Sequence, residues 1–239
     1  MDKPFAGSTV IVAGGTGGLG AAVALAFAAA GARVVVTYRR DAELAALRQR
    51  AAADTVAIEG HAVDVTDATA VRTMVAATLG RHLRIDALVN TVGGYAGGTP
   101  LWQGDGSALE RMLAQNVRAG YVLARAVVPP MLAAGRGSIV NIAAKAAVVP
   151  AAGAAEYAAS KAAALAMMTA LAADLAGSGV RVNSVLPSII DTPANRAAMP
   201  AADFAAWPKP ASIAQVILFL CSRDADAIHG AAIPVYGHA

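Results

Sequence analysis

The sequence predicts an α/β fold, a doubly wound parallel sheet of about seven strands with helices on both faces. Short runs rich in β-branched residues alternate with longer runs rich in alanine and leucine along the 239 residues. Such regular alternation is typical of βαβ units, which build parallel sheets. A glycine-rich segment follows the first strand run, and no repeat or linker divides the chain. We therefore expect a single domain over residues 1–239.

Seven runs are predicted as strands because they are short and many of their residues are β-branched. They lie at 8–13, 33–37, 56–63, 86–90, 137–142, 180–186 and 231–235. Longer runs rich in alanine and leucine favour helices, at 18–30, 41–53, 67–80, 107–134, 156–177 and 212–221. Asp67 and Ser107 are expected N-caps, and Pro129-Pro130 is expected to kink or end the fourth helix. The proline-rich stretch 187–211 is predicted to be a loop with short helical pieces, acting as a substrate lid.

The composition excludes several classes of protein. Hydrophobic residues make up 57% of the chain and charged residues 15%, which predicts a large core rather than disorder. The net charge is +3, and Arg39-Arg40 is the only adjacent basic pair that stands out, so we expect no nucleic-acid partner. The single cysteine, Cys221, excludes an internal disulfide and is expected to be a small core residue. The four histidines show no metal-ligand spacing, so no metal is expected.

One uncharged stretch, residues 10–32, is long enough to span a bilayer. Its glycines divide it into a short strand and a short helix, neither of which could cross alone. The chain begins Met1-Asp2-Lys3-Pro4, without the basic start and apolar stretch of a signal peptide. We therefore expect a cytoplasmic protein without a membrane partner.

The segment AGGTGGLG, residues 13–20, follows the first strand and opens the first helix. It fits G-x-G-x-x-G through Gly15, Gly17 and Gly20, and G-x-x-x-G-x-G through Gly14, Gly18 and Gly20. Without side chains in the way, backbone N–H groups and the helix N-terminus can approach a pyrophosphate. A tight turn is the alternative, but the strand–loop–helix context favours a Rossmann-type dinucleotide site.

The end of the second strand indicates which dinucleotide is bound. NAD-binding proteins usually place a carboxylate there, whereas here the chain reads Tyr38-Arg39-Arg40, with no carboxylate until Asp41. A cation fits a 2′-phosphate, so NADP(H) is favoured over NAD(H). The alternative is that both arginines belong to a solvated helix start.

Tyr157 and Lys161 lie four residues apart, on one face of a predicted helix. A free phenol has a pKa near ~10 and is a poor proton relay at neutral pH. A lysine one turn away can stabilise the phenolate. The pair alone is a weak signal, but between the fifth and sixth strands of a dinucleotide-binding sheet it indicates a catalytic centre.

With these motifs the chain resembles the short-chain dehydrogenase/reductase family over essentially its whole length. Asp64, the turn Asn90-Thr91-Val92-Gly93, Asn116 and the stretch from Asn183 to Pro187 also match family motifs. The resemblance implies that Tyr157 protonates the substrate, that Lys161 binds the nicotinamide ribose and tunes Tyr157, and that Asn116 helps to hold a proton-relay water. The expected cofactor contacts are Gly14, Thr16, Gly17, Gly18, Leu19, Gly20, Tyr38, Arg39, Arg40, Asp64, Val65, Asn90, Gly93, Lys161, Pro187, Ile189 and Thr192.

The family's serine, thirteen residues before the tyrosine, is replaced here by Ala144, and Ala143 offers no substitute. The branch that contains dihydropteridine reductase also lacks this serine. It is similar in three stretches, VGGYAGG (92–98), AAKAA (143–147) and LPSIIDTPANRAAMPAADFAAW (186–207). That branch carries an aspartate where Tyr38 stands and prefers NADH. The expected substrate-side residues are Ala144, Lys145, Tyr95 and Trp207.

The leading functional hypothesis is an NADPH-preferring reductase of an electron-poor C=O or C=N substrate, such as a quinonoid dihydropterin. The alternatives are a general carbonyl or 3-oxoacyl reductase, and a catalytically weakened NADP(H)-binding sensor or scaffold. The resemblance also implies a homodimer or homotetramer that pairs through the helices at 107–134 and 156–177.

Overall fold

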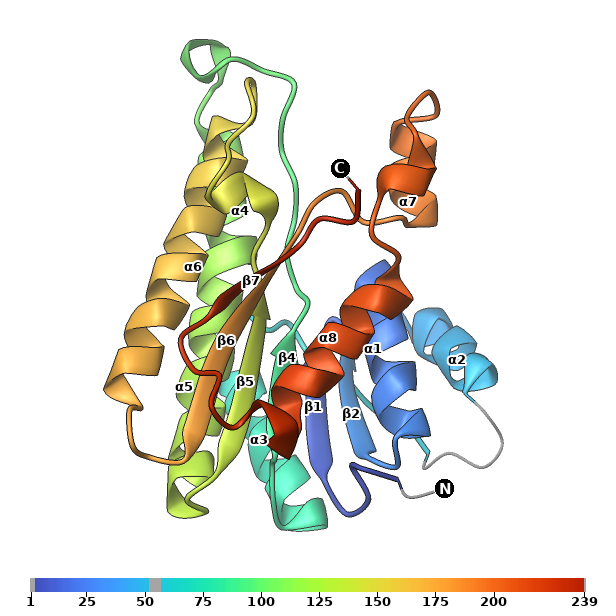
Figure 1. The fold of residues 1–239 in the computed structure, drawn as a ribbon, viewed down its shortest axis with the longest axis vertical. Coiled ribbons are helices and arrows are strands. Elements are labelled where there is room, and N and C mark those ends of the chain that lie inside the picture. Colours follow the sequence, from blue (N-terminus) through green and yellow to red (C-terminus); the bar gives the residue numbers. More distant parts are fainter. Residues whose placement is uncertain (1–2, 52–56, 239) are drawn as a thin grey trace.

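The computed structural model describes residues 3–51 and 57–238 and confirms the predicted fold class (Figure 1). Its described strands form one sheet in the order β3-β2-β1-β4-β5-β6-β7, and every neighbouring pair is parallel. The strands are β1 Thr9–Ala13, β2 Arg33–Tyr38, β3 Glu59–Ala62, β4 Ala87–Asn90, β5 Gly137–Ile142, β6 Val180–Pro187 and β7 Ala232–Val235.

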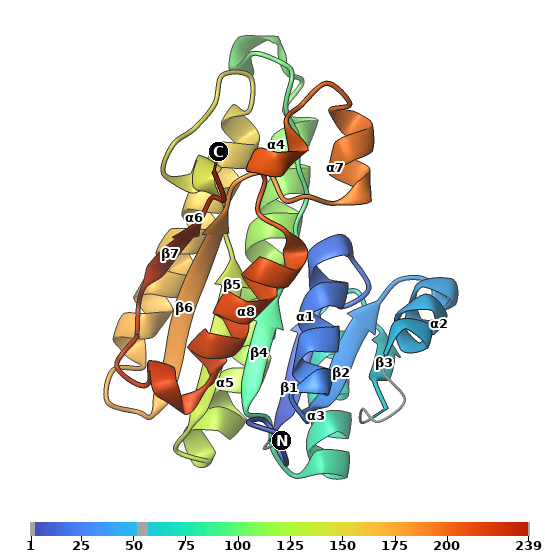
Figure 2. The same cartoon turned by 45° about the vertical axis from the view of Figure 1, so that its right-hand side comes forward.

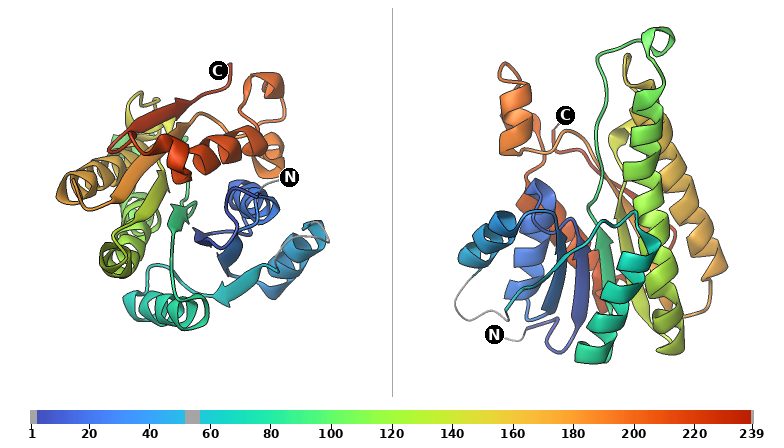
Figure 3. Two further views of the ribbon diagram at one scale, coloured as in Figure 1. Left: turned by 60° about the horizontal axis from the view of Figure 1, so that its bottom comes forward. Right: turned by 180° about the vertical axis from the view of Figure 1, so that it is seen from behind.

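The helices lie on both faces of the sheet, as the end-on view of Figure 3 shows. Helices α1, α2 and α8 pack on one face, and α3, α5 and α6 on the other. The α-helices of the described residues are α1 Gly18–Ala29, α2 Asp41–Arg50, α3 Ala68–His82, α4 Ser107–Leu113, α5 Ala119–Ala133, α6 Ala155–Asp174, α7 Pro193–Ala198 and α8 Pro210–Cys221.

The core explains why the central strands read as continuous apolar runs. In β1 (TVIVA), Val10 and Val12 join the cluster under α1 and α8, whereas Ile11 and Ala13 join the cluster under α3 and α5. Successive side chains of a strand point to opposite faces, so a sheet covered on both sides needs apolar residues at every position.

The helix expected at 107–134 is divided in the structure. A π-helical turn, Ala114–Arg118, separates α4 from α5. The proline pair does not end the helix, because α5 contains Pro129 and Pro130 and runs on to Ala133. Backbone N–H groups just beyond the helix end bond to carbonyls of its last turn, and Gly135 has a φ of +62°, which closes the helix in the left-handed conformation that glycine tolerates.

The two expected N-caps have different outcomes. The Asp67 carboxylate accepts hydrogen bonds from the N–H groups of Thr69 and Ala70, as predicted. Ser107 is instead the first helical residue of α4, and both its N–H and its hydroxyl donate to the Asp105 carboxylate. Residues 52–56, where the second helix was expected to end and the third strand to begin, lie outside the described residues.

The predicted proline-rich loop does contain short helical pieces, α7 and a 3₁₀ turn at Phe204–Ala206. Within the described residues, the stretch Phe204–Cys221 is long and apolar enough for a membrane span by length and composition alone. Most of it is α8, which buries Ile213, Ile217 and Leu220 beside α1. These three side chains belong to the core, whereas Phe219 on the same helix is 45% exposed.

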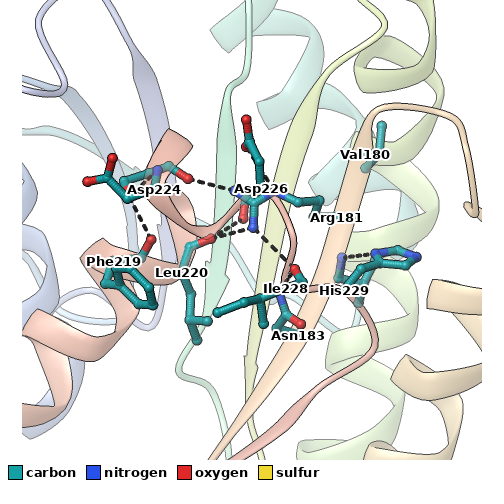
Figure 4. A network of polar contacts seen from close by, with 12 residues as sticks. Val180, Arg181, Asn183, Phe219, Leu220, Asp224, Asp226, Ile228 and His229 are labelled. Atoms are coloured by element: carbon teal, nitrogen blue, oxygen red, sulfur yellow. Dashed lines mark hydrogen bonds and ion pairs between the residues drawn. The ribbon is translucent and has the colours of Figure 1, made fainter.

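The two ends of the parallel strands differ in their surroundings. The segment after β4 and helix α7 both rise above the carboxyl ends of the strands (Figure 2). At the amino ends of the strands lies a hollow of about 760 Å³, lined by residues such as Arg84, Arg181 and Cys221. Arg181 donates to the carbonyls of Leu220 and Ser222 (Figure 4). Cys221 is partly buried and packs against the core. Burial raises the pKa of its thiol to about 12, which makes it a poor nucleophile.

Candidate active site

The sheet order reverses between β1 and β4, because β2 and β3 extend to one side and β5 to β7 to the other. Ligands of open α/β sheets bind outside the carboxyl ends of the strands at such a switch point. Asn90 ends β4 directly beside Ala13, which ends β1 and leads into the glycine loop. The topology therefore places the two predicted cofactor segments side by side.

Close backbone approaches explain the glycines of this loop. Gly14 has a φ of +74°, and its N–H donates to the Thr37 hydroxyl at 2.8 Å. A Cβ on Gly20 would lie 2.1 Å from the Gly14 carbonyl oxygen, and one on Gly15 would lie 2.5 Å from Val36. A side chain at Gly20 would therefore press α1 away from the loop, and one at Gly15 would press the loop away from β2.

The N-terminus of α1 has no side-chain cap. Gly17 occupies the cap position, where its carbonyl accepts from the N–H of Ala21 but no side chain is present to accept from the N–H groups before it. The first N–H groups of an α-helix lack partners within the helix, so those of Gly18, Leu19 and Gly20 suit an anion. The uncapped turn and the side-chain-free loop therefore fit a dinucleotide pyrophosphate.

The glycine loop and the first turn of α1, residues 13–20, form what we call the pyrophosphate cradle. Loop residues from elsewhere in the chain contact this cradle. A Cβ on Gly18 would lie 2.9 Å from the Thr192 methyl group, so the segment after β6 packs against the start of α1. Thr192 also caps α7, accepting from the N–H of Asn195. Pro187 ends β6, and Ile189 is 42% exposed between the two. The expected contacts at Pro187, Ile189 and Thr192 thus lie on one segment that reaches the glycine loop.

The end of β2 presents both charges and a phenol. A hydrogen bond to Asp41, together with burial, raises the pKa of Tyr38. Arg40 is not free, because it pairs with Glu43 of α2. Arg39 is exposed and makes no hydrogen bond or ion pair to the described residues, although its charge acts on Asp64.

Asp64, one of the expected cofactor contacts, follows β3. Its carboxylate accepts hydrogen bonds from the N–H and the hydroxyl of Thr66, at 2.9 and 2.8 Å. These bonds, and to a smaller extent the charge of Arg39, lower the pKa of Asp64 and keep it ionised. The neighbouring Val65 is buried in the core, which fixes the backbone at this point.

Tyr157 and Lys161 lie in the first two turns of α6, as predicted. Lys161 is buried, and its ammonium group donates to the carbonyl of Ile142 at 2.9 Å. Burial lowers the pKa of Lys161 to about 8. Burial, and to a smaller extent Tyr95, raises the pKa of Tyr157 to about 12. Tyr157 therefore holds its proton at neutral pH.

Asn116 lies in the π-helical turn and connects two parts of the site. Its side-chain oxygen accepts from the N–H of Gly94, and its amide nitrogen donates to the Ser160 hydroxyl at 2.9 Å. A Cβ on Gly93 would lie 2.7 Å from the Asn116 oxygen and 3.0 Å from the Lys161 nitrogen. The backbone after β4 thus runs directly over Asn116 and Lys161, which explains glycine at position 93.

The position of the family serine is enclosed. Ala144 is 6% exposed and has extended backbone angles, just before a 3₁₀ turn at Lys145–Ala147. No hydroxyl is present on either Ala144 or Ala143 to polarise a bound carbonyl.

Residues 8–203 match the family described as short chain dehydrogenase. The chain belongs to this family.

Two curated members of the short-chain dehydrogenase family illustrate the similarity. The 2-(R)-hydroxypropyl-CoM dehydrogenase of Xanthobacter autotrophicus is 35% identical, with 95% of this chain and 96% of the relative covered. The 3-oxoacyl-acyl-carrier-protein reductase of Thermotoga maritima is 30% identical, with 97% of each chain covered. Their names show that this short-chain dehydrogenase is similar to both dehydrogenases and reductases.

Solved structures agree. A short-chain type dehydrogenase/reductase from Mycobacterium ulcerans superimposes with a TM-score of 0.92 at 29% identity, covering 98% of this chain and 90% of that one. Levodione reductase superimposes with a TM-score of 0.91 at 26% identity, covering 98% and 97%. The family membership establishes an oxidoreductase that binds NAD(P).

The expected substrate-side residues of this short-chain dehydrogenase divide into two groups. The Tyr95 ring meets the Tyr157 ring edge-on, with centroids 5.0 Å apart, and is 69% exposed. Lys145 lies over the Tyr236 ring at 5.1 Å. Trp207, in contrast, is 6% exposed and packs against Phe204, so the structure gives it a packing role.

Three residues of the site were missed from the sequence. The Thr91 hydroxyl donates to the Ala13 carbonyl at 2.6 Å and joins β4 to the glycine loop. Ser160 carries the bond from Asn116 and donates to the Tyr157 carbonyl. Glu43 accepts from Thr16. Thr91 lies in the turn that matches a family motif and Ser160 lies between Tyr157 and Lys161, but neither motif indicates these hydrogen bonds, and Glu43 stands in no motif. Only the fold shows their contacts. Among the described residues, no group of three or more His, Cys, Asp or Glu is placed to hold a metal ion.

Proposed function

We propose that this short-chain dehydrogenase is an NADPH-preferring reductase of an electron-poor C=O or C=N bond, with a quinonoid dihydropterin as an example. The observation that carries the proposal is a site with Tyr157, Lys161 and Asn116 in place and a buried alanine, Ala144, at the position of the family serine. A strongly polarised substrate depends least on the missing hydroxyl.

The glycine loop and the uncapped start of α1 would hold the pyrophosphate, and Lys161 would bind the nicotinamide ribose. When bound, the nicotinamide supplies the hydride. Arg39 supports the preference for NADPH, since it is exposed at the end of β2 without an ion pair to the described residues. Arginine suits a 2′-phosphate because its planar donors match phosphate oxygens.

Tyr157 is the proton donor in this proposal. With its pKa raised to about 12, the phenol is fully protonated at neutral pH and can release its proton only as negative charge develops on the reduced substrate. Lys161 lies one turn further along α6, and a cation there stabilises the phenolate that remains. Exposed Tyr95, edge-on to Tyr157, supplies an aromatic surface for a planar ring.

The decisive experiment compares two substrate classes with and without a restored hydroxyl. NADPH oxidation is measured with quinonoid dihydropterin and with a panel of ketones, for the natural protein and for Ala144→Ser. Ala143→Ser, which adds the same group at the adjacent buried position, is the matched control. We expect turnover of the pterin by the natural protein and little gain from Ala144→Ser. A failure to reduce any electron-poor substrate would contradict the proposal.

The relatives support a second candidate, a general carbonyl or 3-oxoacyl reductase. One curated relative is named a 3-oxoacyl-acyl-carrier-protein reductase. In that case Ala144→Ser should raise ketone reduction by about a hundredfold, the effect of one donor that stabilises a developing oxyanion. A cofactor-binding sensor would instead bind NADP(H) and reduce neither class.

A further inference from the structure

A carboxylate stands between the glycine loop and the expected 2′-phosphate site. Glu43, in the first turn of α2, accepts from the Thr16 hydroxyl at 3.2 Å through one oxygen. Its other oxygen accepts from the Arg40 guanidinium, with a 2.9 Å bond to Nε. One side chain therefore contacts a residue of the pyrophosphate cradle and one of the two arginines at the end of β2.

These contacts divide the arginine pair. The Arg40 charge is offset by Glu43, whereas Arg39 makes no ion pair to the described residues. The Glu43 side chain is 30% exposed and remains ionised, since its hydrogen bond with Arg40 lowers the pKa of the carboxyl group. A 2′-phosphate arriving beside β2 would meet one unpaired arginine, one neutralised arginine and a carboxylate.

We propose that Glu43 is a specificity residue that limits the preference for a 2′-phosphorylated cofactor, by pairing with Arg40 and by repelling the phosphate. This inference rests on the proposed binding of NADP(H). Glu43 thereby retains affinity for the cofactor without the phosphate, because a ribose hydroxyl can donate to a carboxylate whereas a phosphate cannot.

Two substitutions separate the effect of the Glu43 charge from the effect of its hydrogen bond with Thr16. Glu43→Gln removes the charge but keeps an oxygen that can accept from Thr16, whereas Glu43→Ala removes both. Glu110→Gln on exposed α4 is the control for the loss of one negative charge elsewhere. Binding of 2′,5′-ADP and of 5′-ADP is measured by calorimetry, and binding of NADPH and NADH by fluorescence, so that no result depends on turnover.

We expect Glu43→Gln to tighten binding of 2′,5′-ADP and NADPH by about two- to fivefold, the scale of an exposed charge interaction. Affinity for 5′-ADP and NADH should stay the same or fall. The gain should shrink in Arg40→Gln, where no guanidinium is left to release, and at about 1 M salt, where exposed charges are screened.

Equal changes for both ligands in Glu43→Gln would overturn the inference and assign Glu43 a purely structural role in holding Thr16. So would unchanged affinities in a protein that binds NADPH, and the proposed function would then stand. If the natural protein binds none of the four nucleotides, the proposed function fails and the inference fails with it.

Discussion

At the scale of single residues, Lys161 is unfavourable for the stability of the fold but is needed for the proposed reaction. Its ammonium group is buried, with one hydrogen bond to the Ile142 carbonyl. Burial of a cation with incomplete solvation is unfavourable, and it lowers the pKa of Lys161 from 10.5 to about 8. The folded protein therefore holds a charge that the unfolded chain would solvate better.

The first prediction follows from this shift. Lys161→Met should stabilise the protein at pH 7. A pKa shift of this size corresponds to a burial cost of roughly 3 kcal/mol, and the loss of the hydrogen bond offsets about 1 kcal/mol of the gain from removing that cost. Because the folded pKa is lower than the unfolded one, the unfolded state binds more protons between pH 8 and 10.5. The natural protein should gain stability with pH across that window and the variant should not.

Urea unfolding at a series of pH values measures both effects. The advantage of Lys161→Met should be largest below pH 8 and should disappear near pH 10.5, while turnover is lost at every pH. Lys209→Met, in which an exposed lysine is replaced, is the control for the loss of one positive charge at the surface. A destabilised Lys161→Met variant would show that Lys161 carries structural contacts beyond its single bond.

The second prediction concerns Tyr157. Tyr157→Phe should lower turnover by about a hundredfold to ten-thousandfold, because the phenol is the acid in the proposed reaction. Affinity for NADPH, measured by fluorescence, should change little, and Tyr95→Phe is the matched control for loss of a neighbouring hydroxyl. A variant with unimpaired turnover would disprove the assigned proton donor.

At the scale of elements, one arginine connects the amino end of β6 to the end of α8. The Arg181 guanidinium, on β6, donates to the Leu220 carbonyl at 2.7 Å and to the Ser222 carbonyl at 2.9 Å, and lies 3.5 Å from Asp226 (Figure 4). It therefore fixes the end of α8 against the sheet.

Arg181→Ala should destabilise the protein by about 1–3 kcal/mol, because the Ser222 carbonyl would lose its donor and the Leu220 carbonyl would keep only the 3.2 Å bond from the Ser138 hydroxyl. The measurement is chemical unfolding, with cofactor affinity as a second readout that should stay unchanged, since the site lies at the carboxyl ends of the strands. Arg223→Ala, on the neighbouring exposed turn, should change stability by no more than about 0.5 kcal/mol. Equal effects of the two variants would refute the assignment.

The elements themselves were largely predictable. Each expected strand has its counterpart, and the central strands are the easiest to find, because burial on both faces requires continuous apolar runs. The division of the fourth helix was not predictable, since nothing in the sequence AQNVR, residues 114–118, marks a π-helical turn. Its function is visible only in space, where it brings Asn116 to Gly94 and Ser160.

The site was predictable where a motif carries its own chemistry, as with Tyr157 and Lys161. It was not predictable where chemistry depends on contact between distant segments. The sequence suggested that Arg39 and Arg40 act alike, yet Glu43 pairs with Arg40. An ion pair between exposed side chains depends on rotamers and on the approach of α2 to the glycine loop, and neither is encoded by spacing.

At the scale of the whole molecule, apolar side chains on α4 and α5 remain uncovered. Leu109, Tyr121 and Leu132 are 38%, 51% and 44% exposed. They lie on the helices through which the sequence resemblance predicts pairing. We propose that the protein is a homodimer or homotetramer that uses this surface.

Light scattering at micromolar concentration tests the assembly. The natural protein should be larger than a monomer, and Tyr121→Glu should shift it toward monomer, because a carboxylate buried at an interface without a partner is unfavourable. Leu83→Asp is the control. Leu83 is 86% exposed with a φ of +66°, and aspartate tolerates that conformation. A monomeric natural protein would contradict the proposal.

The bond between Thr91 and Ala13 joins groups 78 residues apart in sequence, and this separation has a consequence for biosynthesis. The ribosome makes the glycine segment early. The cradle, however, lacks its contact with Thr91 until β4 and the turn after it have been synthesised. At roughly 5–20 residues per second, that delay lasts several seconds. A nascent or truncated chain that ends before residue 91 therefore cannot form the complete cradle. Nucleotide in the cell stabilises only molecules whose synthesis has passed that point, because a ligand that binds the folded state alone favours that state by mass action.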